Sequence, residues 1–169
     1  MTARDLETLF DYSYWANRKL FDVVSRLTPE QFTGTVDGTH GSVRNTLVHV
    51  LNAERIWLGR VGGPEPGAAL DPADFPTAES VFAVWKTVEA QLRALLSTLQ
   101  DQDLDREVEF TIGGAKKLSM PVGELLQQAA THGVHHRGQM SLLLRLLGYS
   151  PENFDILLYY IETHRSRTS

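Results

Sequence analysis

Hydrophobic residues recur at three- and four-residue steps through four long segments of this chain. Such spacing places apolar side chains along one face of an α-helix. The pattern therefore predicts four long amphipathic helices, which run from about Ala3 to Leu27, Ser42 to Val61, Thr77 to Gln100 and Pro121 to Leu147.

The segments between these helices carry signals for caps, turns and loops. Thr28 to Gln31 has the sequence of a capping box with Pro29 in the first helical position, so a new helical start is expected there. Gly34 to Gly41 is predicted to be a loop. Gly62 to Gly67 ends the second helix before a proline-rich loop that continues to Pro76.

The pattern changes before and after the fourth helix. Glu107 to Ile112 alternates polar and apolar residues, meets Gly113-Gly114, and resumes as Ala115 to Ser119, which predicts a short β-hairpin. Ser150-Pro151 is expected to begin one more helical piece that contains Ile156 to Tyr159. The expected fold is all-α: a four-helix bundle with a short β-hairpin before the fourth helix and a short C-terminal helix, in a single domain spanning 1–169.

Composition limits the chemistry that the chain can perform. The chain has 169 residues, of which 42% are hydrophobic and 22% charged, and it contains no cysteine. Disulfides, thiolate metal ligands and a cysteine nucleophile are therefore excluded, which leaves His, Asp and Glu as the strong metal ligands.

Charge and hydropathy indicate which partners to expect. The net charge is −5, and the basic runs at Lys116-Lys117 and Arg165 to Arg167 are too short to bind phosphates in series. The sequence has no apolar signal region near Met1 and no apolar stretch approaching 18 residues. We expect a cytoplasmic protein that acts on a small-molecule substrate, with neither nucleic acid nor membrane as a partner.

Three of the six histidines lie within five positions of the predicted fourth helix. His132 and His136 are four residues apart, so they point the same way from one helix, and they fall on or beside its apolar face. His135 lies about 100° round the helix from His136 and is expected to face elsewhere. A histidine pair on an apolar face needs hydrogen bonds or a metal ion to offset the cost of desolvation.

A metal site would need a third ligand from another element. His49 lies within the second helix on the flank of its apolar stripe, whereas His40 falls in a loop and His164 in a polar tail. We therefore predict His49, His132 and His136 as a metal site. The alternative for each is a core histidine whose nitrogens are satisfied by a backbone carbonyl or a hydroxyl group.

Other polar residues interrupt the apolar stripes. Ser13 and Asn17 lie one turn apart in the first helix, where they could line a substrate pocket or make a helix–helix hydrogen bond. Glu54 lies about 140° round the helix from His49, so it is expected to be solvated or behind the ligands rather than a ligand. Catalytic residues beyond the metal ligands, including a general base, are not identified.

Known catalytic motifs narrow the choice further. A di-iron bundle would need Glu-x-x-His pairs, yet the residues three before His132 and His136 are Ala129 and Gly133. The His-Glu-x-x-His motif of zinc proteases and the Gly-x-Ser-x-Gly elbow of serine hydrolases do not occur in the sequence. These observations favour a site for one ion.

Four segments resemble the DinB/YfiT-like family of metalloenzymes, which are DinB-like four-helix bundles. The resemblance covers most of the chain, and its most specific part is His-x-x-x-His-Arg-Gly-Gln. The segments are Asp11 to Asn17, Thr46 to Leu51 together with Trp57, His132 to Gln139, and Phe154 to Tyr160. The family holds a divalent metal with one histidine of the second helix and the spaced pair of the fourth, which implies His49, His132 and His136 here. The helical positions of Arg137 and Gln139 suggest packing or an interface.

The resemblance also implies a range of activities. Three imidazoles on a divalent ion leave positions for water or substrate, as in catalytic zinc sites. Relatives resemble thiol S-transferases or isomerases that use a low-molecular-weight thiol, or hydrolases, and a chain without cysteine would take such a thiol as a cosubstrate. The ligands suit zinc, nickel, iron or manganese. A homodimer is also implied.

Two readings without catalysis compete with the enzyme. The chain could be a non-catalytic metal-binding stress-response protein, which predicts a closed site and a metal ion that strongly raises the melting temperature. It could also be a structural helical bundle in a dimer, which needs no metal. The enzyme predicts an open cleft beside the ion.

Overall fold

A computed structural model describes residues 1–36, 40–112, 114 and 116–165 of the chain. Residues 37–39 of the predicted loop and 113 and 115 of the predicted hairpin lie outside the described residues. Residues 166–169, which include most of the short basic run in the tail, also lie outside them.

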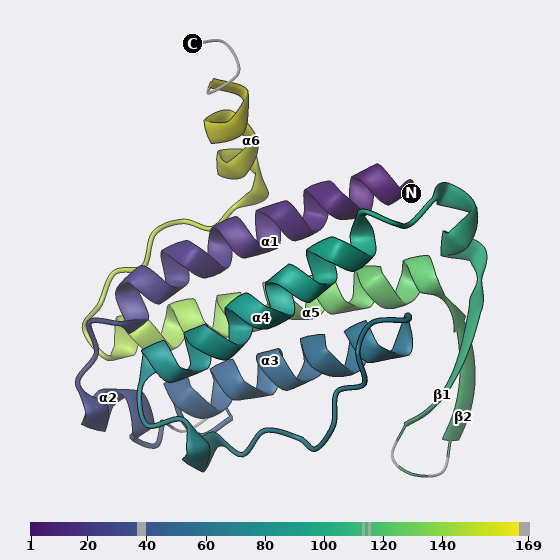
Figure 1. Cartoon of the computed structure of the whole chain (residues 1–169). Helices are drawn as coiled ribbons and strands as arrows, with labels where there is room; N and C mark the ends of the chain where they lie inside the picture. Colours follow the sequence, from purple (N-terminus) through teal and green to yellow (C-terminus); the bar gives the residue numbers. More distant parts are fainter. Residues whose placement is uncertain (37–39, 113, 115, 166–169) are drawn as a thin grey trace.

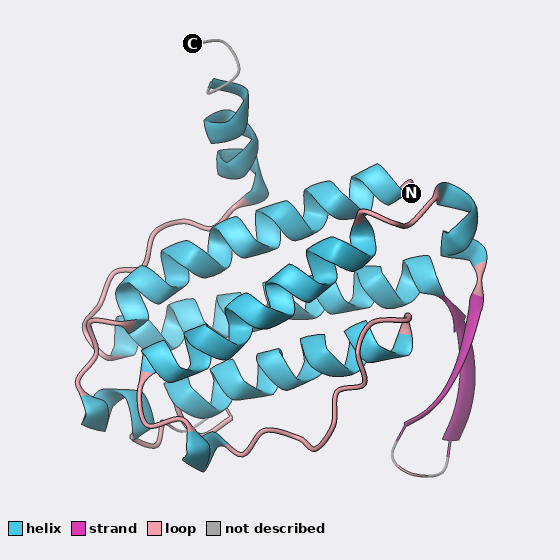
Figure 2. Cartoon of the chain, viewed as in Figure 1, coloured by secondary structure: helices cyan, strands magenta, loops and turns pink. Residues whose placement is uncertain are grey.

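The fold is mostly helical, and the predicted four-helix bundle is confirmed (Figures 1 and 2). Its helices are α1 (Ala3–Val24), α3 (Val43–Arg60), α4 (Ala78–Leu96) and α5 (Val122–Leu146). Helices α1 and α3 each pack against both α4 and α5, so the four helices close around one core. The two helices that carry the predicted metal ligands, α3 and α5, are therefore direct neighbours.

Each bundle helix begins where the chain supplies a side-chain cap or a proline. The hydroxyl of Ser42 accepts a hydrogen bond from the backbone N–H of Asn45 at 3.0 Å and thereby starts α3. Thr77 caps α4 in the same way, as the sequence predicts. The apolar faces then meet in the core, where the ring of Phe21 packs 4.1 Å from Phe82 and 5.5 Å from Trp85 between centroids.

The predicted C-terminal limits of the first and third helices were wrong, because both helices end earlier in tighter turns. After α1, the backbone N–H of Leu27 donates to the carbonyl of Val24 at 3.1 Å, a three-residue spacing. The short helix α2 (Pro29–Thr33) then starts at its predicted capping box, in which Thr28 and Gln31 exchange hydrogen bonds of 3.0 and 3.2 Å.

The predicted hairpin is confirmed in the described residues. Strands β1 (Glu107–Ile112) and β2 (Lys116–Pro121) pair antiparallel, and β2 continues beyond the predicted end to Pro121. The hairpin extends past the end of the bundle (Figure 2). Phe110 of β1 contacts Trp57 of α3 with ring centroids 5.8 Å apart, which attaches the hairpin to that helix.

Three short elements were missed or misplaced by the sequence pattern. The 3-10 turns η1 (Pro72–Asp74) and η2 (Asp101–Asp105) are too short to give a periodic signal. The C-terminal helix α6 (Ile156–Arg165) starts later than the predicted Ser150-Pro151, since Asp155 caps the N–H of Leu157 at 2.9 Å. Helix α6 projects from the bundle (Figure 1). None of the described helices combines the length and apolar character that crossing a membrane requires.

Candidate metal centre

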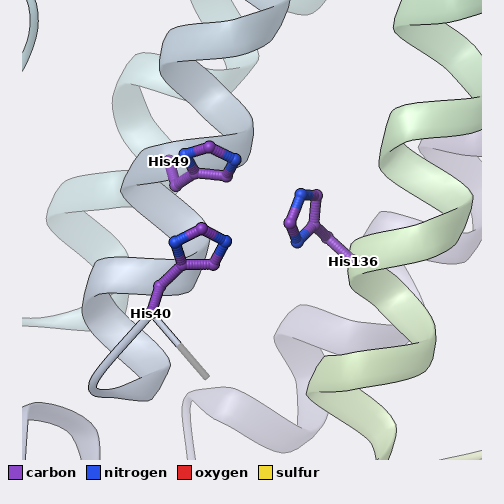
Figure 3. A group of neighbouring side chains, drawn as sticks. All are labelled: His40, His49 and His136. Atoms are coloured by element: carbon purple, nitrogen blue, oxygen red, sulfur yellow. The ribbon is translucent and has the colours of Figure 1, made fainter. Parts of the chain in front are cut away.

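The predicted ligands come together where α3 faces α5. His49 lies between the buried residues Val48 and Val50 on α3, and its ring centroid is 5.2 Å from that of His132 and 4.7 Å from that of His136. Figure 3 shows His49 and His136 facing each other across the two helices. His49 is 83 residues from His132 and 87 from His136 in the sequence, yet the three rings are neighbours in the fold.

The two histidines of α5 approach each other through their outer nitrogens. Nε2 of His132 and Nε2 of His136 are 3.1 Å apart. Two nitrogens bound to one zinc ion at about 2.0–2.1 Å would lie roughly 3–3.4 Å apart in octahedral or tetrahedral geometry. The separation therefore fits two ligands of one ion, and it also fits a single hydrogen bond between the rings.

His40 joins the cluster, although sequence analysis set it aside as a loop residue. It comes directly before Gly41, whose carbonyl accepts a hydrogen bond from the backbone N–H of Val36 at 2.7 Å, and Gly41 takes a φ of +98° that favours glycine. The ring of His40 stacks on that of His49 at 4.0 Å with an interplanar angle of 19° (Figure 3). Loop packing of this kind leaves no periodic signal in the sequence.

Two sets of three histidines share His49 and His136. The nitrogens of His40, His49 and His136 lie within 4.8 Å of one another, an arrangement compatible with a metal ion. The predicted set replaces His40 with His132, whose ring is inclined by 44° to His49 and by 62° to His136. The lone pair of an imidazole lies in the ring plane, so inclined rings can converge on one ion.

Ring orientation differs between the two sets. His40 and His49 lie almost parallel, with an interplanar angle of 19°, and their nitrogens still lie within 4.8 Å of one another and of those of His136. His49 and His136 are inclined by 70° and can converge. Both sets share His49 and His136, the structure groups the exposed His40 with them, and His132 as the third ligand stays a prediction.

Burial keeps the predicted ligands in the form that binds metal. Burial, together with the neighbouring rings of His136 and His49, lowers the pKa of the His132 ring to about 4. Burial likewise lowers the pKa of His49 and of His136. The lowered pKa values favour the neutral form of all three rings, which is the form that binds a metal ion.

The surroundings grade from open to closed across the cluster. His40 is exposed, His49 and His132 are half-buried, and His136 has only 5% of its surface exposed. Nδ1 of His136 lies 2.7 Å from Oε1 of Gln139. Sequence analysis assigned Gln139 to packing, but its position three residues after His136 was a signal that it could reach that ring.

Comparison with known proteins identifies the family. A model of the DinB family matches residues 1–167. The chain belongs to the DinB family. Protein DinB of Bacillus subtilis (strain 168) is 23% identical over 165 residues, which cover 94% of this chain and 96% of that protein. The uncharacterized protein YjoA of the same strain is 32% identical over 131 residues, or 76% of this chain and 82% of that protein.

A solved structure supports the fold of this DinB-family chain. The crystal structure of a DinB-like protein from Bacillus cereus ATCC 10987 superposes with a TM-score of 0.70 at 23% identity, covering 90% of this chain and 97% of that chain. The predicted resemblance and fold class are thereby confirmed. At this identity the superposition shows the fold and does not assign an activity.

In this DinB-family chain, Ser13 and Asn17 contact Arg137 inside the bundle. Nη1 of Arg137 donates to Oδ1 of Asn17 at 3.0 Å, and Nη2 lies 3.4 Å from Oγ of Ser13. Asn17 and Ser13 are 5% and 3% exposed. These contacts are the helix–helix hydrogen bonds that were the alternative for this pair, and their role in substrate binding stays a prediction.

Glu54 is buried, so the first of its two expected roles, a solvated carboxylate, was wrong, and a position behind the ligands stays a prediction. Its Oε2 accepts a hydrogen bond from Nε1 of Trp85 at 2.9 Å, which links α3 to α4. Burial raises the pKa of the Glu54 carboxyl to about 7, while the Trp85 hydrogen bond and the charge of Arg137 partly oppose this shift. Glu54 faces the bundle interior, where Trp85 of α4 covers it. A helical wheel gives the direction of a side chain and does not show which residues of other helices cover it.

Proposed function

We propose that this DinB-family chain binds one divalent metal ion through His49, His132 and His136 and works as a metal-dependent enzyme on a small molecule. The observation that carries the proposal is the convergence of three inclined, neutral imidazoles from α3 and α5. Three imidazole ligands fill part of the coordination shell of a zinc-like ion and leave room for another ligand.

The surrounding residues would prepare this site for chemistry. A divalent ion supplies Lewis acidity, which lowers the pKa of a water or thiol that binds beside it. The three rings bind without adding charge, since burial lowers the pKa of each. Substrate would approach from the exposed side, where His40 lies over the ring of His49.

The reaction class that we propose is thiol S-transfer or hydrolysis. The chain has no cysteine, so a thiol for S-transfer would be a separate low-molecular-weight cosubstrate. An exposed approach to the histidines supports turnover over storage, because a storage site needs no access for a second molecule. A non-catalytic metal-binding protein in the stress response is the alternative.

Single substitutions test the ligand set. In zinc competition titrations on untagged protein, we expect His49→Ala, His132→Ala and His136→Ala each to weaken binding by more than about 100-fold, beyond the usual effect of residues behind the ligands. His40→Ala should weaken binding by less than about tenfold, and His164→Ala on α6 is the matched control. Loss of binding in His40→Ala but not in His132→Ala would assign the other set of three. A wild-type protein that binds no divalent ion would overturn the proposal.

A second experiment tests the enzyme against the storage protein. Cobalt-loaded protein is titrated with glutathione and with free cysteine while thiolate-to-cobalt absorption is followed. Absorption that saturates with a thiol supports S-transfer. If neither thiol binds, hydrolysis of activated esters by zinc-loaded protein is measured next. Metal binding with neither response would support the non-catalytic alternative.

A further inference from the structure

We propose that His135 and Gln139 form a hydrogen-bonded chain behind His136 that selects which nitrogen of His136 faces the metal site. This inference rests on the proposed function, because it assigns His136 as a ligand. It also gives a role to the third histidine of the crowded segment, which the ligand set leaves out.

The three side chains follow one another along α5. Nδ1 of His136 lies 2.7 Å from Oε1 of Gln139, and Nε2 of Gln139 lies 3.2 Å from Nε2 of His135. The rings of His135 and His136 are 4.9 Å apart at an angle of 78°. Spacings of three and four residues bring such side chains together on a helix.

The first contact fixes the tautomer of His136. An amide oxygen only accepts hydrogen bonds, so Nδ1 of His136 carries the hydrogen in its contact with Gln139. A neutral imidazole has one N–H, and Nε2 therefore keeps its lone pair. Nε2 is the nitrogen that faces His132 at 3.1 Å. Gln139 thus presents the ligating nitrogen of His136 to the site.

The second contact fixes the orientation of Gln139. An amide turned by 180° would direct its NH₂ group at Nδ1 of His136, and the hydrogen of His136 would then move to Nε2, where it blocks an ion. The NH₂ group can only donate, so Nε2 of His135 accepts from it. With its own hydrogen on Nδ1, His135 favours the orientation that turns the amide oxygen toward His136, because the reversed amide would need a hydrogen on Nε2 of His135. His135 and Gln139 are both positioning residues.

The hydrogen bond from His136 to Gln139 also differs from the usual contact behind a metal-binding histidine. A carboxylate or a backbone carbonyl commonly accepts the second N–H of such a ring. Here a neutral amide does so, which orients the ring without adding negative charge behind it. A carboxylate at position 139 would keep the acceptor and pull harder on the N–H of His136, so Gln139→Glu should preserve or strengthen metal binding.

The test combines tautomer and affinity. Long-range ¹H–¹⁵N correlation spectra of metal-free wild type should show His136 with its hydrogen on Nδ1. Gln139→Leu should give a mixture of tautomers and weaken zinc binding by about 10–100-fold, as residues behind metal ligands do. Gln139→Glu should bind at least as tightly as wild type. His135→Ala should give a smaller, several-fold loss with a partial tautomer shift, and Gln128→Leu, which changes an exposed glutamine of α5, is the control.

The outcomes separate this inference from the proposed function. A wild-type His136 with its hydrogen on Nε2 would overturn the chain even if zinc binds. Zinc affinity in Gln139→Leu within twofold of wild type would also overturn it. A wild type that binds no zinc would overturn the proposed function, and the spectra of metal-free protein would still decide the tautomer.

Discussion

His136 and Arg137 are consecutive residues of α5, and each belongs to a different polar cluster. The two clusters differ in the atoms that their polar groups contact. His136 faces His49 of α3, and its Nε2 lies 3.1 Å from Nε2 of His132, one turn earlier on α5. Arg137 turns toward α1, where its guanidinium donates to Asn17 and approaches Ser13. In the second cluster the Nη atoms of Arg137 meet acceptors of α1, while Nε of Arg137 and Nδ2 of Asn17 are buried without a hydrogen-bond partner among the described residues. In the first, like atoms converge, which is the arrangement that a shared cation stabilises.

Burial alone would not have separated the two clusters. His136 and Arg137 are each 5% exposed, and Glu54 is 6% exposed. What differs is the surroundings: the histidine cluster continues to the exposed His40, whereas Arg137 packs against α1 and lines a surface pocket together with Tyr12 and Phe154. A buried polar residue therefore indicates a ligand site only when its neighbours leave nitrogens directed at a common point.

The largest expected effect separates the two clusters by metal binding. His136→Ala should weaken zinc binding by more than about 100-fold, because it removes the most enclosed ligand. Arg137→Met keeps an unbranched side chain at the next position and should bind zinc within a few-fold of wild type. Both are measured by competition with a chromogenic chelator. Equal losses in the two variants would contradict the division into two clusters.

The next effect concerns the pH dependence of folding through Glu54. Its pKa is raised by burial from 4.5 to about 7, so the folded protein favours the neutral carboxyl and loses stability as pH rises through this range. In Glu54→Gln this loss is absent. The difference in the free energy of unfolding, Glu54→Gln minus wild type, should therefore rise by roughly 2–3 kcal/mol as the pH is raised from 5 to 8.

Comparing the two proteins removes the contribution of the histidines to that measurement. The lowered pKa of His132 gives the opposite slope, with stability that falls as pH drops below 6.5 toward 4. Both proteins share this term when urea unfolding is measured in the presence of a metal chelator. A difference between them that stays constant with pH would show that the Glu54 carboxyl is not shifted.

A smaller effect is expected for protein stability when the hydrogen bonds of Arg137 are removed. Arg137→Met should lower the free energy of unfolding by about 1–3 kcal/mol, because the buried acceptor on Asn17 loses its donor. Chemical denaturation measures this, with Arg145→Met on the exposed surface of α5 as the control. A variant as stable as wild type would mean that the Arg137 hydrogen bonds contribute nothing net.

The smallest effect concerns Gly133, which makes room for Arg137. A Cβ at position 133 would lie 3.1 Å from Nη1 of Arg137, which Asn17 holds in place. Gly→Ala in a helix stabilises by about 1 kcal/mol, so Gly133→Ala should realise less of that gain in wild type than in Arg137→Met. A double-mutant cycle should give a coupling of about 0.5–1 kcal/mol. Identical effects in both backgrounds would remove the steric argument.

The sequence predicted those features that depend on local periodicity. Helix starts are local, because the side chains of Thr28, Ser42 and Thr77 each accept a hydrogen bond from the backbone N–H three residues later. The four-residue spacing of His132 and His136 is likewise local and places both rings on one side of α5. Helix ends were less predictable. After Val24 the apolar residue Leu27 continues the helical pattern, but the backbone hydrogen bonds there span three residues and no longer four. The implied homodimer stays a prediction.

The missed features depend on packing between distant segments. The pairing of Arg137 with Asn17 spans 120 positions, and the stacking of His40 on His49 depends on the path of a loop. The burial of Glu54 follows from the placement of Trp85 on another helix. Gln139 is different, since its spacing from His135 and His136 was visible in the sequence and pointed to contacts within one helix.

X-ray absorption spectroscopy of zinc-loaded, untagged protein tests the central claim most directly. The account predicts one zinc ion per chain with three imidazole nitrogens at about 2.0–2.1 Å and at least one further oxygen or nitrogen ligand that does not come from histidine. A spectrum without imidazole scattering, or a protein that retains no stoichiometric zinc, would contradict it.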